Sequence, residues 1–267
     1  MNISHPQNMN ISHPQNSREA FKMITLALSF LKRDSPESNE LINFLYTPDP
    51  RISDHLNQLR DFLRIKRPTK AQSQKAGYLL ERILLLAFKG LTGHSELKNY
   101  QSASHQIDQL VSGDNTEWDL ILDRLYLKEN NQTYRTILGE AKATNSSVSV
   151  SQFARLCSIM TLELYKSVGL GVFFTINGAA GFPKRSQKSR TSCIRHARLC
   201  QVLFNARSGK KIVVLDKDDI FDLDKNGSLI TILIRKIKEL EENSGLPTVS
   251  VVEPMDIDLP NYLKDLI

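Results

Sequence analysis

Apolar and polar positions in the first third of the chain follow the period of a helix. Apolar residues recur every three or four positions over residues 17–33, where Ser17 fits the N-cap position. Two shorter helices are predicted at 38–46 and 53–65. A longer, leucine-rich helix is predicted from Thr69 to Leu91, before a glycine-containing region. The front of the chain is therefore expected to be helical.

The pattern changes after this helix, where short runs fit strands that are separated by Gly, Asp, Asn and Gln. The predicted elements are strands at 105–111, 118–127 and 134–142, a helix at 149–167, strands at 171–176 and 211–215, and helices at 190–207 and 227–243. Helix, three strands, helix and strand is thus the expected order in the middle of the chain. This order predicts an α/β fold with a mixed central sheet flanked by helices.

The two ends of the chain are set apart from this pattern. Residues 1–8, MNISHPQN, recur without change at 9–16, so we expect a disordered duplicated segment. We expect a helical region at 17–68, a catalytic domain at 69–245 and a tail at 246–267.

Composition narrows the class of protein. The 267 residues are 40% apolar and 24% charged, which is typical of a globular protein. No apolar run reaches the roughly 18–20 residues that a membrane-spanning helix needs, and the start does not resemble a secretory signal, so we expect a cytoplasmic protein without membrane contact. The formal charge of +6 favours a polyanionic partner. The sequence contains no GxxxxGK[ST] loop, so we expect no nucleotide cofactor.

The strongest chemical signal is a carboxylate and an amine on an apolar strand. In the stretch Thr136–Ala143, Glu140 and Lys142 are two residues apart and therefore project from the same face. Buried charges are costly unless they are paired, hydrated or bound to a ligand. A salt-bridged pair at a sheet edge is the structural alternative to a catalytic pair.

Four segments, in order, resemble the PD-(D/E)xK nuclease superfamily, also called restriction-endonuclease-like, and its Mrr-like and Holliday-resolvase-like branch. They are Gln106–Val111 with Asp108, Glu140-Ala141-Lys142, Gln152-Phe153-Ala154-Arg155, and Gly171–Asn177. The resemblance covers roughly residues 70–220 and implies a restriction-endonuclease-like core with an α-helical N-terminal extension.

The resemblance also implies roles for these residues. Asp108 and Glu140 are expected to hold Mg²⁺, for which Mn²⁺ can substitute, and Lys142 is expected to assist the attacking water. Gln152 and Arg155 share a helix face and are expected to support the site. Two further carboxylates are candidates: Glu81, on an apolar helical stripe, is a possible extra metal ligand, and Asp119 is a rival to Asp108.

The implied activity is hydrolysis of double-stranded DNA to 5′-phosphate and 3′-hydroxyl ends by a homodimer, in restriction or anti-phage defence. A basic run after the strand at 171–176 is expected to contact DNA phosphates, although a solvated loop would look the same; its residues are Lys184, Arg185, Lys188 and Arg190. A junction resolvase, an inactive DNA-binding or assembly subunit of the same fold, and a basic interaction module are the alternatives.

Overall fold

The computed structural model describes residues 36–101, 107–129, 132–143, 146–182 and 196–244. The duplicated start, the helix predicted at 17–33, the basic run at 184–190 and the C-terminal tail lie outside the described residues. No helix within the described ranges is long and apolar enough to cross a membrane.

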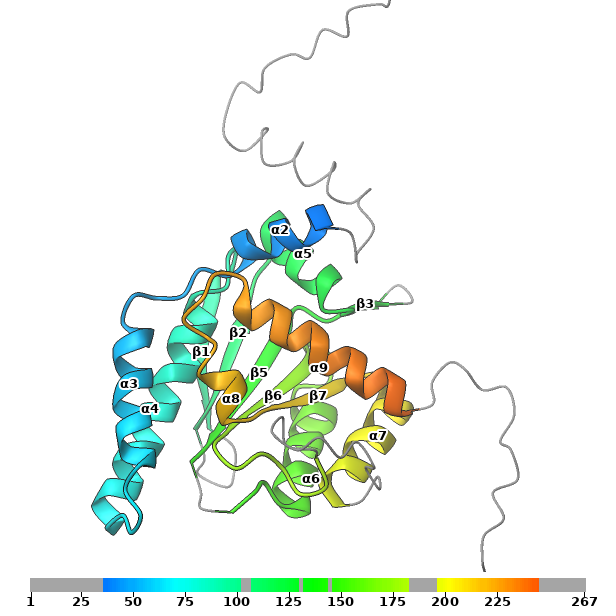
Figure 1. Cartoon of the computed structure of the whole chain (residues 1–267). Helices are drawn as coiled ribbons and strands as arrows, with labels where there is room; N and C mark the ends of the chain where they lie inside the picture. Colours follow the sequence, from blue (N-terminus) through cyan, green and yellow to red (C-terminus); the bar gives the residue numbers. More distant parts are fainter. Residues whose placement is uncertain (1–35, 102–106, 130–131, 144–145, 183–195, 245–267) are drawn as a thin grey trace, which may run out of the picture.

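A five-stranded mixed sheet forms the centre of the fold, in the order β1-β2-β5-β6-β7 (Figure 1). Strands β1, β2 and β5 are antiparallel, whereas β5, β6 and β7 are parallel. Their bounds are Glu96–Gln101 for β1, Ile107–Ser112 for β2, Thr136–Lys142 for β5, Val168–Thr175 for β6 and Lys211–Leu215 for β7. The short strands β3 (Lys128–Glu129) and β4 (Gln132–Thr133) pair with each other. The predicted α/β class with a mixed sheet is confirmed.

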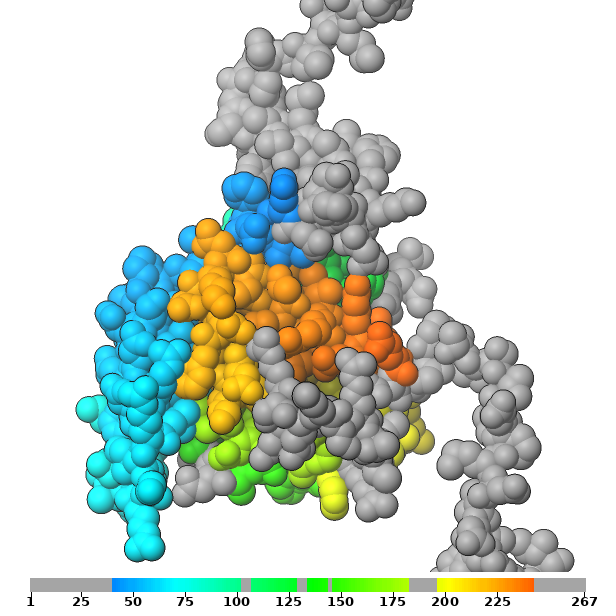
Figure 2. All heavy atoms as spheres, viewed as in Figure 1, coloured from blue at the N-terminus to red at the C-terminus, as the bar shows by residue number. Residues whose placement is uncertain are grey.

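Helices cover both faces of this sheet. The larger core cluster joins one face to α2 (Pro36–Leu45), α3 (Ile52–Leu63), α4 (Lys70–Lys89), α5 (Thr116–Arg124) and α9 (Ser228–Ser244). The smaller cluster joins the other face to α6 (Val150–Ser158) and α7 (His196–Ser208). In the space-filling view, α3 and α4 form one flank in blue and cyan, and α9, in orange, crosses the middle of the view (Figure 2). The result is a three-layered arrangement.

The N-terminal helices are part of this core. The Tyr46 hydroxyl, which is buried, donates to the main-chain oxygen of Leu223 at 2.7 Å, and the Gly227 amide donates back to the Tyr46 carbonyl. Ile52, in α3, is also buried in the same cluster. These contacts tie α2 and the start of α3 to the loop between the short helix α8 (Lys217–Ile220) and α9.

One predicted strand is wrong. The segment predicted as a strand at 118–127 is mostly helix α5, which begins where the Asn115 side chain accepts a hydrogen bond from the Trp118 amide at 2.9 Å. The third antiparallel strand is instead β1, at 96–101, where the sequence pattern predicts none. Consequently β2 lies directly beside β5, with no strand between them.

A close approach of α4 to β5 fixes the position of the central strand. A Cβ atom at Gly139 would lie 2.6 Å from Leu84 Cδ1 and 2.7 Å from the Phe88 ring, so a larger residue cannot occupy this position without displacing α4. Glycine here allows the helix to cover one face of β5 while Glu140, the next residue, projects to the other.

Candidate active site

Asp108 and Glu140 are brought together by the pairing of β2 with β5. Gln109 is opposite Gly139 in the antiparallel register, so Asp108 and Glu140 are the neighbouring residues on their strands and project from the same face. Both side chains are fully buried. Two carboxylates are therefore held side by side in the interior, beneath α6.

Two cations contact this carboxylate pair. Lys142 Nζ forms an ion pair with Glu140 Oε1 at 3.1 Å. The Arg155 guanidinium donates to Glu140 Oε2, and its other terminal nitrogen lies 3.5 Å from Asp108 Oδ2. Arg155 thus bridges carboxylates from two strands. The structure brings Asp108, Glu140, Lys142 and Arg155 into one cluster.

The helix that carries Arg155 is fixed at its first turn by a capping box. The Ser149 side chain accepts from the Gln152 amide, and Gln152 Oε1 accepts from the Ser149 amide at 2.9 Å. Gln152 therefore helps to start α6, one turn before Arg155. The hydrogen bonds between Gln152 and Ser149 support the site by fixing the start of α6, and not by a contact with the carboxylates.

Burial makes ionisation of the carboxylates unfavourable. Desolvation, followed by the nearby charge of Glu140, raises the pKa of Asp108 to about 7, although Arg155 and Lys142 oppose the shift. Desolvation also raises the pKa of Glu140, against the opposing effects of Lys142 and Arg155. Asp108 Oδ1 is buried and has no hydrogen-bond partner among the described residues. Such an orphaned oxygen is costly unless a proton or a cation satisfies it.

The donor set fits a magnesium ion with few protein ligands. No group of three or more His, Cys, Asp and Glu side chains in the described part of the chain is arranged to hold a metal. Two carboxylates do meet, however, and Mg²⁺ is usually bound through one or two carboxylates with waters completing its shell. The orphaned Asp108 oxygen is compatible with this role, and Asp108 and Glu140 are the residues that could hold the ion.

Glu81 lies on α4, across β5 from this cluster. Its side chain is solvent-accessible, and partial desolvation raises its pKa while the charge of Lys142 lowers it. The electrostatic effect of Lys142 places Glu81 near the lysine. No contact between Glu81 and Asp108 or Glu140 is observed among the described residues.

The structure places Asp119 away from the carboxylate pair. It lies on α5 and forms ion pairs with Arg135 at 3.0 Å and with Lys128 at 3.6 Å. Arg135 immediately precedes β5, whereas Glu140 is four residues into the strand from Thr136, a separation of about 13 Å at about 3.3 Å per residue. Asp119 therefore sits near the opposite end of β5.

Two polar residues beside the cluster are not identified from the sequence. Tyr100 pairs with Asp108 in the register of β1 with β2, and its hydroxyl donates to Glu163, which together with burial raises the pKa of Tyr100 to about 12. Thr175 pairs with Lys142 across β5 and β6, and its buried hydroxyl has no hydrogen-bond partner within the described ranges. Thr175 could have been found from the sequence, because it is a polar residue at the end of an apolar strand. Tyr100 could not, because it lies on the edge strand β1, which the sequence pattern does not predict.

Comparison with known proteins finds no matching family model, no matching curated protein and no matching solved structure. Fold and site geometry are therefore the basis for a functional inference. The four basic residues expected to contact DNA lie outside the described residues.

Proposed function

We propose that the chain is a metal-dependent endonuclease with a restriction-endonuclease-like core, acting on double-stranded DNA in restriction or anti-phage defence. The observation that carries the proposal is the buried pair Asp108 and Glu140, on adjacent strands, with Lys142 two residues after Glu140. One Asp108 oxygen also lacks a hydrogen bond to any residue that the structure describes. A structural ion pair alone does not require two carboxylates to be buried side by side.

The order of elements also supports this core. Helix α4 is followed by the antiparallel strands β1 and β2, then by α5 and the short β3–β4 pair, and then by β5, α6 and β6, which is parallel to β5 (Figure 1). The strands of the central sheet follow the helix, three strands, helix and strand order expected from the sequence, but β1 replaces the strand predicted at 118–127, and α5 with the β3–β4 pair interrupts the order between β2 and β5. The substitution supports Asp108 over Asp119, because it removes the strand that separated Asp108 from Glu140.

Each residue of the cluster has a chemical role in this proposal. A Mg²⁺ or Mn²⁺ ion held by Asp108 and Glu140 would supply Lewis acidity and a bound water of lowered pKa. Lys142, whose side chain is 12% exposed, provides a cation at the open side of the pair, where it can orient water and stabilise negative charge on phosphorus. Arg155 holds both carboxylates in position. In-line attack by water would leave 5′-phosphate and 3′-hydroxyl ends, and paired cuts would require a homodimer.

One observation favours a second candidate, an inactive DNA-binding or assembly subunit of the same fold. When both carboxylates are ionised, Lys142 and Arg155 balance their charges, so the cluster is then electrically neutral without a metal ion. A buried, balanced ion network can serve structure alone. This candidate predicts a folded protein that binds DNA without cleaving it.

A cleavage assay with matched aspartate variants separates these candidates. Supercoiled plasmid, phage DNA with modified bases and single-stranded DNA are incubated with the full chain in Mg²⁺, Mn²⁺ or EDTA. We expect metal-dependent cleavage by the wild type and by Asp119→Asn, and loss of at least a hundredfold in rate for Asp108→Asn and Lys142→Ala. Circular dichroism and DNA binding check that the inactive variants remain folded.

The nuclease proposal fails if no substrate is cut in either metal and calorimetry detects no metal binding to the folded wild type. Cleavage that survives in Asp108→Asn but is lost in Asp119→Asn would also refute the assigned site, since it would move the metal ligand to α5.

A further inference from the structure

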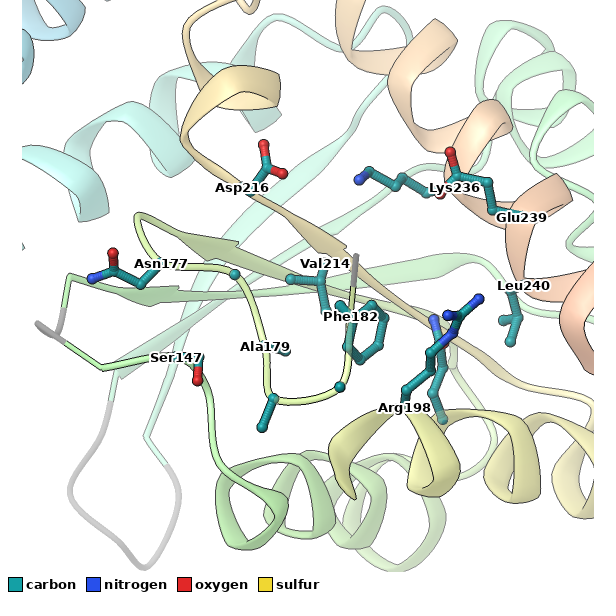
Figure 3. Close-up of a pocket in the computed structure, with 14 residues that line it drawn as sticks. Ser147, Asn177, Ala179, Phe182, Arg198, Val214, Asp216, Lys236, Glu239 and Leu240 are labelled. Carbon is teal, nitrogen blue, oxygen red and sulfur yellow. The ribbon is translucent and has the colours of Figure 1, made fainter. Parts of the chain in front are cut away.

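A cavity of about 350 Å³ lies at the carboxyl ends of β6 and β7, apart from the carboxylate cluster. The loop after β6, from Asn177 to Phe182, forms one wall, while α7 and α9 form the others (Figure 3). The volume is near the small end of the range for small-molecule sites, roughly 300–1,000 Å³. Carboxyl ends of neighbouring parallel strands are a common location for ligands in α/β sheets.

Arg198 is the unusual residue of this cavity. It lies on α7 and is only 6% exposed, and its Nη1 atom has no hydrogen-bond partner within the described part of the chain. Figure 3 shows its side chain rising from α7 toward α9, into the space that Lys236 and Glu239 face from the other side. A buried guanidinium group with an unmet donor is costly. The cavity therefore presents a donor that a bound acceptor would satisfy.

The charges around the cavity argue against a phosphate as the main ligand. Arg198 and Lys236 are the cations among the lining residues, and Asp216 and Glu239 are the carboxylates. Lys236 is also held by Asp219 at 2.9 Å, which reduces its attraction for an anion. Because the charges of the lining are balanced, a bound dianion would gain little electrostatic stabilisation. A neutral group with both donor and acceptor atoms would gain from both signs of charge.

Apolar and aromatic surface completes the cavity. The Phe182 ring lies in the wall and packs against Phe153, with 6.0 Å between the ring centroids. Val214 and Leu240 add aliphatic surface. A flat, neutral heterocycle can contact such surfaces while its edge meets the guanidinium and carboxylate groups.

We propose that this cavity binds a nucleobase, with Arg198 donating to the acceptor atoms of the base edge and Glu239 or Asp216 accepting from its amino or imino groups. The base could belong to a free nucleotide or to DNA from which it is extruded. Binding of a free nucleotide would be independent of the proposed nuclease activity, because the cavity contains neither Asp108 nor Glu140. Binding of a base extruded from DNA rests on the proposed function as a DNA-acting protein.

The first test measures nucleotide binding by the full chain. Each of the four nucleoside 5′-monophosphates, and ribose 5-phosphate, is titrated by calorimetry in EDTA. We expect at least one nucleotide to bind and ribose 5-phosphate not to bind. Arg198→Met should weaken binding roughly tenfold to a hundredfold. Arg207→Met, an exposed arginine of the same helix, should bind as the wild type does.

A second variant keeps the test valid if Arg198→Met does not fold. Glu239 is exposed on α9, so Glu239→Gln should leave folding intact while it weakens nucleotide binding roughly threefold or more. Equal binding of ribose 5-phosphate and the nucleotides would overturn the proposal, because the cavity would then be recognising phosphate.

The DNA source is tested with duplexes that carry 2-aminopurine at several positions, in EDTA so that no strand is cut. Fluorescence that increases with wild type and with Arg207→Met, but not with Arg198→Met or Glu239→Gln, assigns the base to DNA. Nucleotide binding without this increase assigns it to a free nucleotide. If neither signal is seen, the inference is wrong, whatever the result of the cleavage assay.

Discussion

Replacing Arg155 with methionine tests the ion cluster most directly. The guanidinium of Arg155 bridges two fully buried carboxylates, and its own side chain is only 20% exposed. Removing one partner of a buried pair typically costs about 3–5 kcal/mol, because an uncompensated charge is left inside. Lys142 still contacts Glu140, whereas Asp108 loses its nearest cation. At about pH 8, where Asp108 is ionised in the folded wild type, we expect the free energy of unfolding of Arg155→Met to fall by about 4 kcal/mol without metal.

The assay is chemical and thermal unfolding in EDTA, followed by circular dichroism. A loss of about 4 kcal/mol corresponds to a fall of about 8–16 °C in Tm for a domain of this size. Arg207→Met, which removes an exposed arginine, should change Tm by less than about 2 °C. Adding Glu140→Gln to Arg155→Met should restore about 2 kcal/mol, since one of the buried charges disappears.

Divalent metal gives the decisive comparison. If Asp108 and Glu140 can hold a cation, Mg²⁺ should stabilise Arg155→Met by about 2.7 kcal/mol at a hundred times its Kd. A loss below about 1 kcal/mol for Arg155→Met in EDTA would refute the view that Arg155 compensates both carboxylates. If Arg155→Met loses about 4 kcal/mol of stability in EDTA and neither Mg²⁺ nor Mn²⁺ restores any of it, the result would instead favour the inactive subunit.

Three further predictions concern stability. Lys210 is buried and donates to three main-chain carbonyls at 2.6–2.9 Å. Lys210→Met should therefore lower the free energy of unfolding, measured by denaturant titration, by about 3 kcal/mol. The control Lys217→Met, at an exposed lysine, should leave it nearly unchanged. Ser149→Ala removes the cap of α6 and should cost about 1 kcal/mol; no change would show that the cap is not formed. Because the pKa of Asp108 is raised to about 7, the folded wild type retains a proton on this side chain that the unfolded chain loses above about pH 4. The contribution of Asp108 to stability in EDTA should therefore fall between about pH 4 and 7 and then level off, and the stability of Asp108→Asn relative to wild type should rise over that range. A flat difference between these two proteins would exclude the raised pKa.

The elements that the sequence predicts well are those with long apolar runs or clear caps. Strand β7 is found at the predicted residues 211–215, and α4 begins one residue after Thr69, which closes a capping box with Gln72. Helix α5 is not predicted from the sequence, for a physical reason. Trp118, Leu120 and neighbouring apolar residues are all buried, so the segment has no single apolar stripe to give a helical period. The cap at Asn115 is its clearest local signal.

Edge strand β1 is hidden for the opposite reason. Its six residues, ELKNYQ, are exposed or half-buried, and a polar edge strand lacks the apolar alternation by which strands are identified. The spacing of Glu140 and Lys142 was sufficient to place them on one face. The contact of Arg155 with two strands could not be obtained in this way, because it depends on how α6 packs on the sheet and on the register of β2 with β5.

The charge balance of the cluster leads to a prediction about metal affinity. Above the raised pKa of Asp108, at about 7, Asp108 and Glu140 supply two negative charges, which Lys142 and Arg155 already match. A divalent cation would leave an excess of positive charge in a buried site unless a phosphate enters with it. Mn²⁺ should therefore bind wild type weakly, and at least tenfold more tightly in the presence of a duplex with non-cleavable phosphorothioate linkages. Arg155→Met should bind Mn²⁺ tightly without DNA, as measured by electron paramagnetic resonance of free Mn²⁺. Equal affinity in all three cases would mean that the cation does not bind between these carboxylates.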